Sequence, residues 1–293
     1  MAAITAKMVS DLRAKTGVGM MDCKKALNEA NGDFDEAVKI LREKGLSVAA
    51  KKAGRVAAEG VVDIMVEGNT AVMIEVNSET DFVAKNETFK EFVRGLEKTL
   101  LATRPATVEA KLKDMIFTIG ENMNIRRFVI VDGVVSTYIH GNGGTGVIVK
   151  FNADDAAANN AGFAEFAKNI ALQIAAGNPP AYVSRDQVPA SAVEEEKAIL
   201  IAQIKNDEKN AKKPEAIIEK MVTGKIGKFY ERVCLVEQAY VKDDDMKVGE
   251  YVAKCAKDFG GEIAIDSFYL YEKGEGLEKR EDNFGDEIAE RLK

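Results

Sequence analysis

The stretch VVDIMVEGNTAVMIEVN, residues 61–77, is the most informative part of the sequence for the fold. Two apolar runs flank the turn residues Gly68 and Asn69, a pattern that predicts two strands joined as a hairpin. A helix is expected further on, where apolar residues recur at helical spacing. The residues of that helical face are Phe89, Phe92, Val93 and Leu96. The stretch therefore predicts a hairpin followed by a helix.

The same order of elements recurs about 74 residues later in the chain. VVSTYIHGN (134–142) repeats VVDIMVEGN (61–69), and GVIVKFN (146–152) matches AVMIEVN (71–77). Phe163 and Phe166 then match Phe89 and Phe92. This internal repeat predicts a pair of similar α+β subdomains.

The first 45 residues have the pattern of three short helices. Thr5 can cap the first helix and Gly17 can end it, while Asn31 and Gly32 stop the second. Asp33, with Glu36 three residues later, resembles a capping box for the third helix, and Gly45 is its expected stop. The segment is thus expected to form a compact three-helix module.

A second helical region interrupts the latter half of the chain. From Ser191 a charged helix is expected; the chain breaks at NAKKP (210–214) and becomes helical again. The apolar stripes consist of Val193, Ile199, Leu200, Ile201, Ile204, Ile217, Ile218, Met221, Val222 and Ile226. Two antiparallel helices joined by a short turn would bury these stripes against each other. A solvated projection is the simplest interpretation of this arm.

The composition excludes several classes of function. Lys and Arg number 41 against 48 Asp and Glu, so the net charge of −7 argues against direct nucleic-acid binding. His140 is the one histidine, and Cys23, Cys234 and Cys255 lie far apart, so a His or Cys metal site is not expected. No window has the length and apolarity of a membrane span, and the N-terminus lacks a secretory pattern. A cytoplasmic protein without membrane attachment is expected.

Gly141, Gly143 and Gly146 match the dinucleotide-binding pattern G-x-G-x-x-G. In a nucleotide site, however, a helix follows the glycines, so that its N-terminus meets the pyrophosphate. Here the strand-like run VIVKF (147–151) follows. The glycines are better explained as an enlarged hairpin turn.

Phe82 allows two interpretations. It lies seven residues before Phe89, so it could extend the core face of the helix. The second copy, NADDAAANN (152–160), instead offers Ala156 or Ala157 at the matching place, so the fold does not demand an aromatic ring there. Phe82 is then a candidate anchor for a partner. Met20 and Met21 also allow two interpretations, since they can fill the small module's core or form an adaptable binding surface.

Long stretches of the sequence closely resemble the bacterial translation elongation factor Ts family. These stretches are TGVGMMDCKKALNEANGD (16–33), AAKKAGRVAAEG (49–60), EVNSETDFVAKN (75–86), IGENMNIRR (119–127), YIHG (138–141), KPEAIIEKMVTGKIGKFY (213–230) and GEGLEKREDNF (274–284). They follow the family order and extend over nearly the whole chain.

The resemblance implies a specific α+β organisation. A three-helix, ubiquitin-associated-like module would occupy residues 1–54, and a first core subdomain residues 55–133. A second core subdomain would occupy 134–268 and contain an inserted coiled-coil hairpin at about 190–228. A C-terminal module, 269–293, would carry the last helix near Asn283 to Leu292, although Gly285 is unfavourable to that helix's start.

The activity implied by the resemblance is guanine nucleotide exchange on elongation factor Tu. In the family, the Asp-Phe of the TDFV sequence enters the partner's G domain near its nucleotide and Mg²⁺ site. The residues in that position here are Thr80, Asp81, Phe82 and Val83. GDP, GTP and Mg²⁺ then belong to the partner, so no cofactor and no catalysed bond-making step are expected of this chain.

Further partner contacts follow from the same resemblance. Ile119, Gly120 and His140 match residues of the same partner-facing surface, although His140 could equally be an exposed hairpin-tip side chain. Arg13, Met20 and Met21 match residues of the N-terminal module that touch the G domain. The helical hairpin could also pair two chains, which would give a 2:2 complex.

Two other functions remain open at the level of sequence. One is a generic chaperone-like interaction module that uses Met20 and Met21. The other is an enzyme with paired carboxylates such as Asp154 and Asp155, which lacks a recognisable nucleophile and base.

Overall fold

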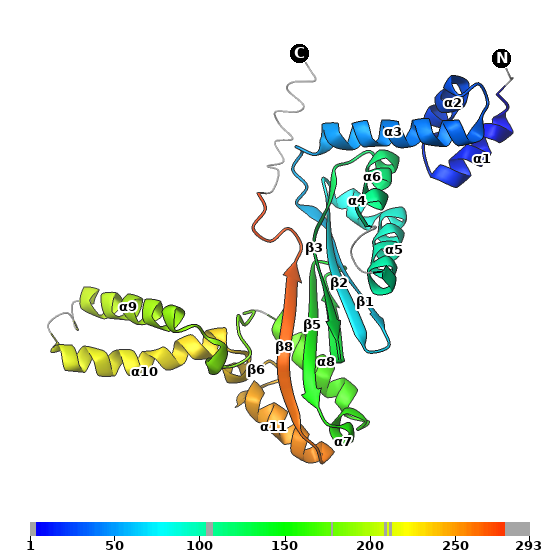
Figure 1. Ribbon diagram of the computed structural model, residues 1–293. Helices are drawn as coiled ribbons and strands as arrows, with labels where there is room; N and C mark the ends of the chain where they lie inside the picture. Colours follow the sequence, from blue (N-terminus) through cyan, green and yellow to red (C-terminus); the bar gives the residue numbers. More distant parts are fainter. Residues whose placement is uncertain (1–3, 104–107, 177, 208–209, 211–212, 279–293) are drawn as a thin grey trace.

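The N-terminal helices begin where the capping residues predict. The computed structural model describes the chain except for residues 1–3, 104–107, 177, 208–209, 211–212 and 279–293 (Figure 1). Helix α1 (Ala6–Thr16) follows Thr5, whose hydroxyl accepts a hydrogen bond from the Met8 N–H at 3.2 Å. Helix α2 spans Met20–Glu29. Helix α3 (Phe34–Lys52) follows Asp33, whose carboxylate accepts from the Glu36 N–H at 2.8 Å. The three-helix prediction is therefore confirmed.

Gly45 does not end α3, and this expectation was wrong. The helix continues to Lys52, and Gly45 is buried in its middle. A β-carbon on Gly45 would lie 3.4 Å from Cβ of Phe117, which belongs to α6 (Val108–Ile119). The missing side chain thus allows two helices to approach closely. Because of its extra length, α3 reaches the first sheet's core, where Ala49 is buried.

The first sheet has the antiparallel order β1-β2-β3. Strands β1 (Glu59–Glu67) and β2 (Thr70–Ser78) form the predicted hairpin, with Gly68 at φ 59° in the turn. Strand β3 (Met123–Asp132) pairs with β2 and has no predicted counterpart. Helices α5 (Glu87–Thr103) and α6 cover the outer face, with Phe89, Val93 and Leu96 in the core beneath α5.

The second sheet repeats this arrangement with the order β4-β5-β8. Its strands are β4 (Val134–His140), β5 (Thr145–Ala153) and β8 (Ile263–Glu272). Helices α8 (Phe163–Ala175) and α11 (Val248–Phe259) supply the core on its outer face. The expected boundary after residue 268 falls inside β8, because that strand stays paired with β5 as far as Glu272.

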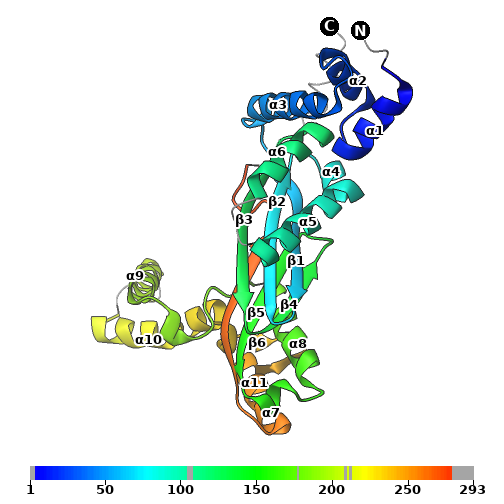
Figure 2. The same ribbon diagram turned by 45° about the vertical axis from the view of Figure 1, so that its right-hand side comes forward.

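The inner faces of the two sheets pack against each other (Figures 1 and 2). Met73 of β2 and Ile148 of β5 belong to one buried cluster between the sheets. The neighbouring residues Val72 and Ile74 face the helices instead. Strand β2 is therefore buried on both faces, which explains why AVMIEVN shows no alternation of apolar and polar residues.

The hairpin turn after β4 supplies a close contact between the sheets. Gly143 has φ 89°, and a β-carbon there would lie 2.1 Å from Cγ2 of Val61. Its carbonyl also accepts a hydrogen bond from the Val62 N–H at 2.9 Å. Strand β5 follows the turn directly, so the interpretation of these glycines as a hairpin turn is confirmed.

The helical arm projects sideways from the second sheet (Figure 1). Helices α9 (Ala190–Asn206) and α10 (Glu215–Val233) pack against each other as predicted, and α10 extends past the expected residue 228. Their seam is formed by Leu200, Ile204, Ile218 and Val222. Ile199 and Ile217 were expected in the seam but are exposed, because they lie on other faces of their helices.

Short elements connect these parts. They are α4 (Asp81–Lys85), α7 (Asp155–Ala158), the single turns Arg185–Gln187 and Leu235–Glu237, and the small hairpin of β6 (Ala239–Tyr240) and β7 (Asp243–Lys247). The protein is thus of mixed α+β class, as predicted. The helix expected near residues 283–292 lies outside the described residues.

Candidate functional site

Phe82 lies on the surface, at the second position of the short helix α4. Thr80 caps this helix, since its hydroxyl accepts a hydrogen bond from the Val83 N–H at 3.4 Å. Val83 is buried in the core of the first sheet, whereas Phe82 is 80% exposed. The core interpretation of Phe82 was wrong, because Asn86 ends α4 and separates it from the helix that carries Phe89.

The second half of the molecule contains the counterpart of α4. Asp154 caps α7 by accepting from the Ala157 N–H at 2.9 Å, and Ala157 is buried, as Val83 is. Aligning the two caps matches Phe82 with Ala156, which is also exposed. The choice between Ala156 and Ala157 is thereby resolved. Within the described part of the chain, the large aromatic ring at this exposed position serves no packing role.

Asp81 is the first residue of α4 and forms an ion pair on the helix surface. Its carboxylate lies 2.6 Å from Nζ of Lys85, one turn further on. The hydrogen bond from Lys85 lowers the pKa of Asp81 below its usual value. Asp81 therefore presents a negative charge next to the exposed ring at neutral pH.

The loop after α6 lies against the beginning of α4. Gly120, at φ 85°, follows Ile119 at the helix end, and its carbonyl accepts a hydrogen bond from Lys52 of α3. The next residue, Glu121, binds Thr80 through both of its carboxylate oxygens. The structure thus brings Thr80 close to the Ile119–Gly120 loop.

His140 is the last residue of β4, a strand that ends beside a hollow next to α4, but His140 is not among the residues that line this hollow. Its side chain is exposed, and Nδ1 lies 3.1 Å from the Tyr138 hydroxyl. The hollow, of about 380 Å³, is lined by α4, α5, β1, the end of β4 and the β4–β5 turn. The lining residues are Val61, Val62, Asp63, Ala84, Lys85, Lys90, Arg94, Ile139, Asn142 and Gly143. The strand that carries His140 and the helix that carries Phe82 therefore flank one depression.

Arg13 lies on helix α1, and Met20 and Met21 lie on helix α2. Met20 is 55% and Met21 66% exposed, so the interpretation of these residues as core was wrong. Leu12 and Leu27 fill that core instead. Arg13 is also exposed, on α1. Helices α1 and α2 lie at the outer end of α3, whereas α4 lies beside the first sheet (Figures 1 and 2).

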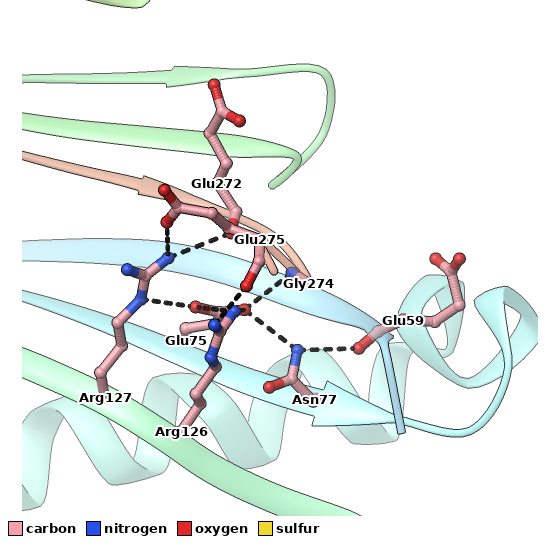
Figure 3. Close-up of polar contacts among 8 residues, drawn as sticks. All are labelled: Glu59, Glu75, Asn77, Arg126, Arg127, Glu272, Gly274 and Glu275. Atoms are coloured by element: carbon pink, nitrogen blue, oxygen red, sulfur yellow. Dashed lines mark hydrogen bonds and ion pairs between the residues drawn. The ribbon is translucent and has the colours of Figure 1, made fainter. Parts of the chain in front are cut away.

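A buried ionic cluster centred on Glu75 was missed by sequence reasoning (Figure 3). Glu75 lies on β2, facing the space between the sheets, and is fully buried. Its carboxylate accepts from Nε of Arg127 at 2.7 Å and from Nη1 of Arg126 at 3.1 Å. It also accepts from the Gly274 N–H at 2.8 Å and from Nδ2 of Asn77 at 3.1 Å.

These hydrogen bonds determine the charge of Glu75. Burial alone would raise its pKa, but the bonds from Gly274, Asn77 and the two arginines lower the pKa overall. Arg127 continues outward to the carboxylate of Glu275 at 2.9 Å. The cluster therefore connects β2 and β3 to the segment that follows β8. The available sequence signals were an acidic residue inside an apolar strand and the adjacent arginine pair.

Other titratable groups have structural roles. Hydrogen bonds from the backbone N–H groups of Ala157 and Glu262 lower the pKa of Asp154, which acts as a helix cap. Cys23, Cys234 and Cys255 are buried free thiols. Among the described residues, no three His, Cys, Asp or Glu side chains gather as a metal site. Within the same ranges, no helix has the length and apolarity to cross a bilayer.

Comparison with known proteins identifies the family. A family model described as Elongation factor TS matches residues 79–275. Elongation factor Ts of Syntrophotalea carbinolica is 47% identical over 309 residues, covering 99% of each chain. Elongation factor Ts of Clostridium botulinum (strain 657 / Type Ba4) is 44% identical over 310 residues, covering 99% of this chain and 98% of the relative.

These matches place the protein among the translation elongation factors, with a mixed α and β fold. The chain belongs to the elongation factor Ts family. Three of the stretches that resemble the family meet in the buried cluster. Residues 75–86 supply Glu75, residues 119–127 supply both arginines, and residues 274–284 supply Gly274.

Proposed function

We propose that this protein binds elongation factor Tu and promotes release of GDP, which GTP then replaces. The observation that carries this proposal is the exposed ring of Phe82 on a short helix anchored by buried Val83. An exposed aromatic side chain on a fixed support is suited to enter a partner's surface. Family membership makes elongation factor Tu the expected partner.

The proposed docking surface has two parts. The first consists of α4, the Ile119–Gly120 loop next to it and His140 at the end of β4. The second consists of Arg13, Met20 and Met21 on α1 and α2. The α4 part would act near the nucleotide site of the G domain, and the N-terminal part would add affinity.

The mechanism follows from thermodynamic linkage. A protein that binds the nucleotide-free GTPase more tightly than the GDP-bound form lowers the affinity for GDP by the same factor. Burial of one phenyl ring supplies roughly 1.5 to 3 kcal/mol, which corresponds to about one or two powers of ten. The remaining effect would come from the wider interface. GDP, GTP and Mg²⁺ would be bound by the partner, and this chain would need no cofactor.

The division of the chain is part of the proposal. Residues 1–54 would form the ubiquitin-associated-like module, and the two sheets with their helices would form the repeated core. The α9–α10 arm would be a coiled-coil insertion that can pair two chains in a 2:2 complex. The protein would act in the cytoplasm, without direct contact to nucleic acid.

The test is release of a fluorescent GDP analogue from purified elongation factor Tu. Substoichiometric amounts of this protein should accelerate release, because fresh nucleotide displaces it and regenerates the free protein. An unchanged release rate at micromolar protein would overturn the proposal.

A chaperone-like module remains the second candidate, favoured by the exposure of Met20 and Met21. This function would be supported if the protein bound several unfolded chains as tightly as it bound elongation factor Tu.

A further inference from the structure

Two adjacent residues before α4 are bonded to two adjacent residues before β3. Glu121 accepts hydrogen bonds from the Thr80 hydroxyl at 2.7 Å and from the Thr80 N–H at 3.0 Å. In the other direction, Glu79 accepts from the Asn122 N–H at 2.5 Å. The two segments are separated by about 40 residues, so these bonds fix the start of α4 on the sheet.

The segment after α3 joins the same group of bonds. The carbonyl of Arg55 accepts from Nδ2 of Asn122 at 2.7 Å, and the guanidinium of Arg55 lies 3.4 Å from Glu79. Lys52 reaches the carbonyl of Gly120. Three segments distant in sequence therefore converge just before Phe82.

The position of α4 depends on such bonds because the helix has only five residues, Asp81–Lys85. A single turn gains too little from its internal hydrogen bonds to be stable alone. Its orientation is set by the cap, by buried Val83 and by the attachment of Thr80. Phe82 makes no contribution to the core, so the other residues must hold it in place.

The second half attaches its corresponding helix differently. There, one side chain both caps the short helix and attaches it to a distant segment. Asp154 caps α7 and also accepts a hydrogen bond from the Glu262 N–H at 2.9 Å. In the first half, Thr80 provides the cap and the separate carboxylate of Glu121 provides the attachment. Glu121 is thus an additional charged group in the half that carries the exposed aromatic ring.

We propose that Glu121 is a positioning residue that holds Thr80, and through it Phe82, in the orientation required for nucleotide exchange. This inference rests on the proposed function. A side chain already ordered before docking loses less conformational freedom on binding. Removing the attachment should therefore slow exchange without removing any group that touches the partner's nucleotide site.

The experiment is a double-mutant cycle of Glu121→Ala and Phe82→Ala, with GDP release from elongation factor Tu as the measurement. Glu121→Ala alone should slow release by roughly two- to tenfold. In the Phe82→Ala background it should cause no further slowing, because the ring it positions is gone. Equal slowing in both backgrounds, or no slowing in either, would overturn the inference. Glu165→Ala, an exposed change on α8, is the matched control and should leave release unchanged.

Amide hydrogen exchange of the free protein gives a second measurement that does not depend on the partner. Glu121→Ala should speed exchange of the Val83 and Ala84 N–H groups several-fold while the core strands stay protected. Glu121→Gln, which keeps the side-chain shape and one acceptor oxygen, should restore part of that protection. Unchanged protection of α4 would overturn the positioning role even if the parental protein proved inactive in GDP release. Failure of the proposed function would instead appear in the parental protein. Its α4 would be protected from hydrogen exchange, but it would not accelerate GDP release from elongation factor Tu.

Discussion

Phe82 and Ala156 occupy equivalent positions, each two residues after the cap of a short helix whose next residue is buried. We predict that Phe82→Ala loses most exchange activity but changes the free energy of unfolding by less than about 1 kcal/mol. The physical reason is that the exposed ring contributes no core packing. The measurements are fluorescent GDP release and chemical denaturation.

The matched control for this prediction is Phe89→Ala on α5. Phe89 is fully buried, so its truncation should cost about 3 to 5 kcal/mol of stability. A loss of that size in Phe82→Ala, with GDP release at the parental rate in the folded fraction, would show that the ring is structural and not an anchor.

Gly143→Ala should destabilise the protein by more than Gly141→Ala. Both glycines have positive φ angles, 89° and 60°, which an alanine adopts at a cost of roughly 1 kcal/mol. Only at Gly143 would the new methyl group collide with Val61, whereas the space around Gly141 is open. Thermal unfolding of the two variants should separate them by at least about 1 kcal/mol. Equal stabilities would contradict the role of Gly143 in sheet packing.

Glu97 should make the protein less stable as the pH rises. It lies on α5 with 1% exposure, and its Oε1 has no hydrogen-bond partner within the described part of the chain. Burial, reinforced by the nearby charge of Asp63, raises the pKa of Glu97 to about 9. Between pH 4.5, its ordinary pKa, and about 9 the unfolded chain releases this proton while the folded chain keeps it, so stability falls.

Glu97→Gln should therefore stabilise the protein at pH 7 by roughly 3 kcal/mol and flatten this decline. Urea denaturation at several pH values is the measurement. Parallel pH profiles for the variant and the parental protein would show that Glu97 is ionised in the folded state.

Glu75 should have the opposite pH dependence. Its pKa is lowered in the folded protein, so its contribution is present above its ordinary value of 4.5 and is lost as the pH falls through the folded value. Glu75→Gln should cost about 3 kcal/mol at pH 7, because it leaves Arg126 and Arg127 without their buried counter-charge. The difference in stability between Glu75→Gln and the parental protein should become smaller at acidic pH.

Glu272→Gln is the control for Glu75→Gln. Arg127 contacts only the backbone carbonyl of Glu272, so neutralising that side chain leaves the cluster intact. If the two variants had equal stability at pH 7, the cluster would contribute nothing measurable.

The features that the sequence predicted well are those decided by neighbouring residues. Thr5 and Asp33 cap helices through bonds to backbone groups three residues away, and the turn at Gly68 joins adjacent strands. Such signals lie within a few residues of one another. The exposure of Phe82 was less local, but the internal repeat supplied a second copy with which to compare it.

The features that the sequence did not reveal depend on distant partners. Gly45 resembles a helix stop until Phe117 packs against it. Strand β3 carries Arg126 and Arg127 directly before the apolar run of residues 128–131, and these charges become compatible with the sheet only when Glu75 faces them. The docking partner itself lies outside the chain, so its identity rested on the family resemblance.

The buried cluster also constrains the order in which the chain can fold during synthesis. Residues 59–132 supply all three strands of the first sheet, so that sheet can assemble early. At that stage Glu75 lacks its hydrogen bond from the Gly274 N–H, and the inner face of the first sheet has no second sheet packed against it. Water must solvate this carboxylate and its two arginines until residue 274 has left the ribosome. The core beneath α5 needs only residues 49–123, but the inner face of the sheet around Glu75 stays hydrated until the segment after β8 has been synthesised.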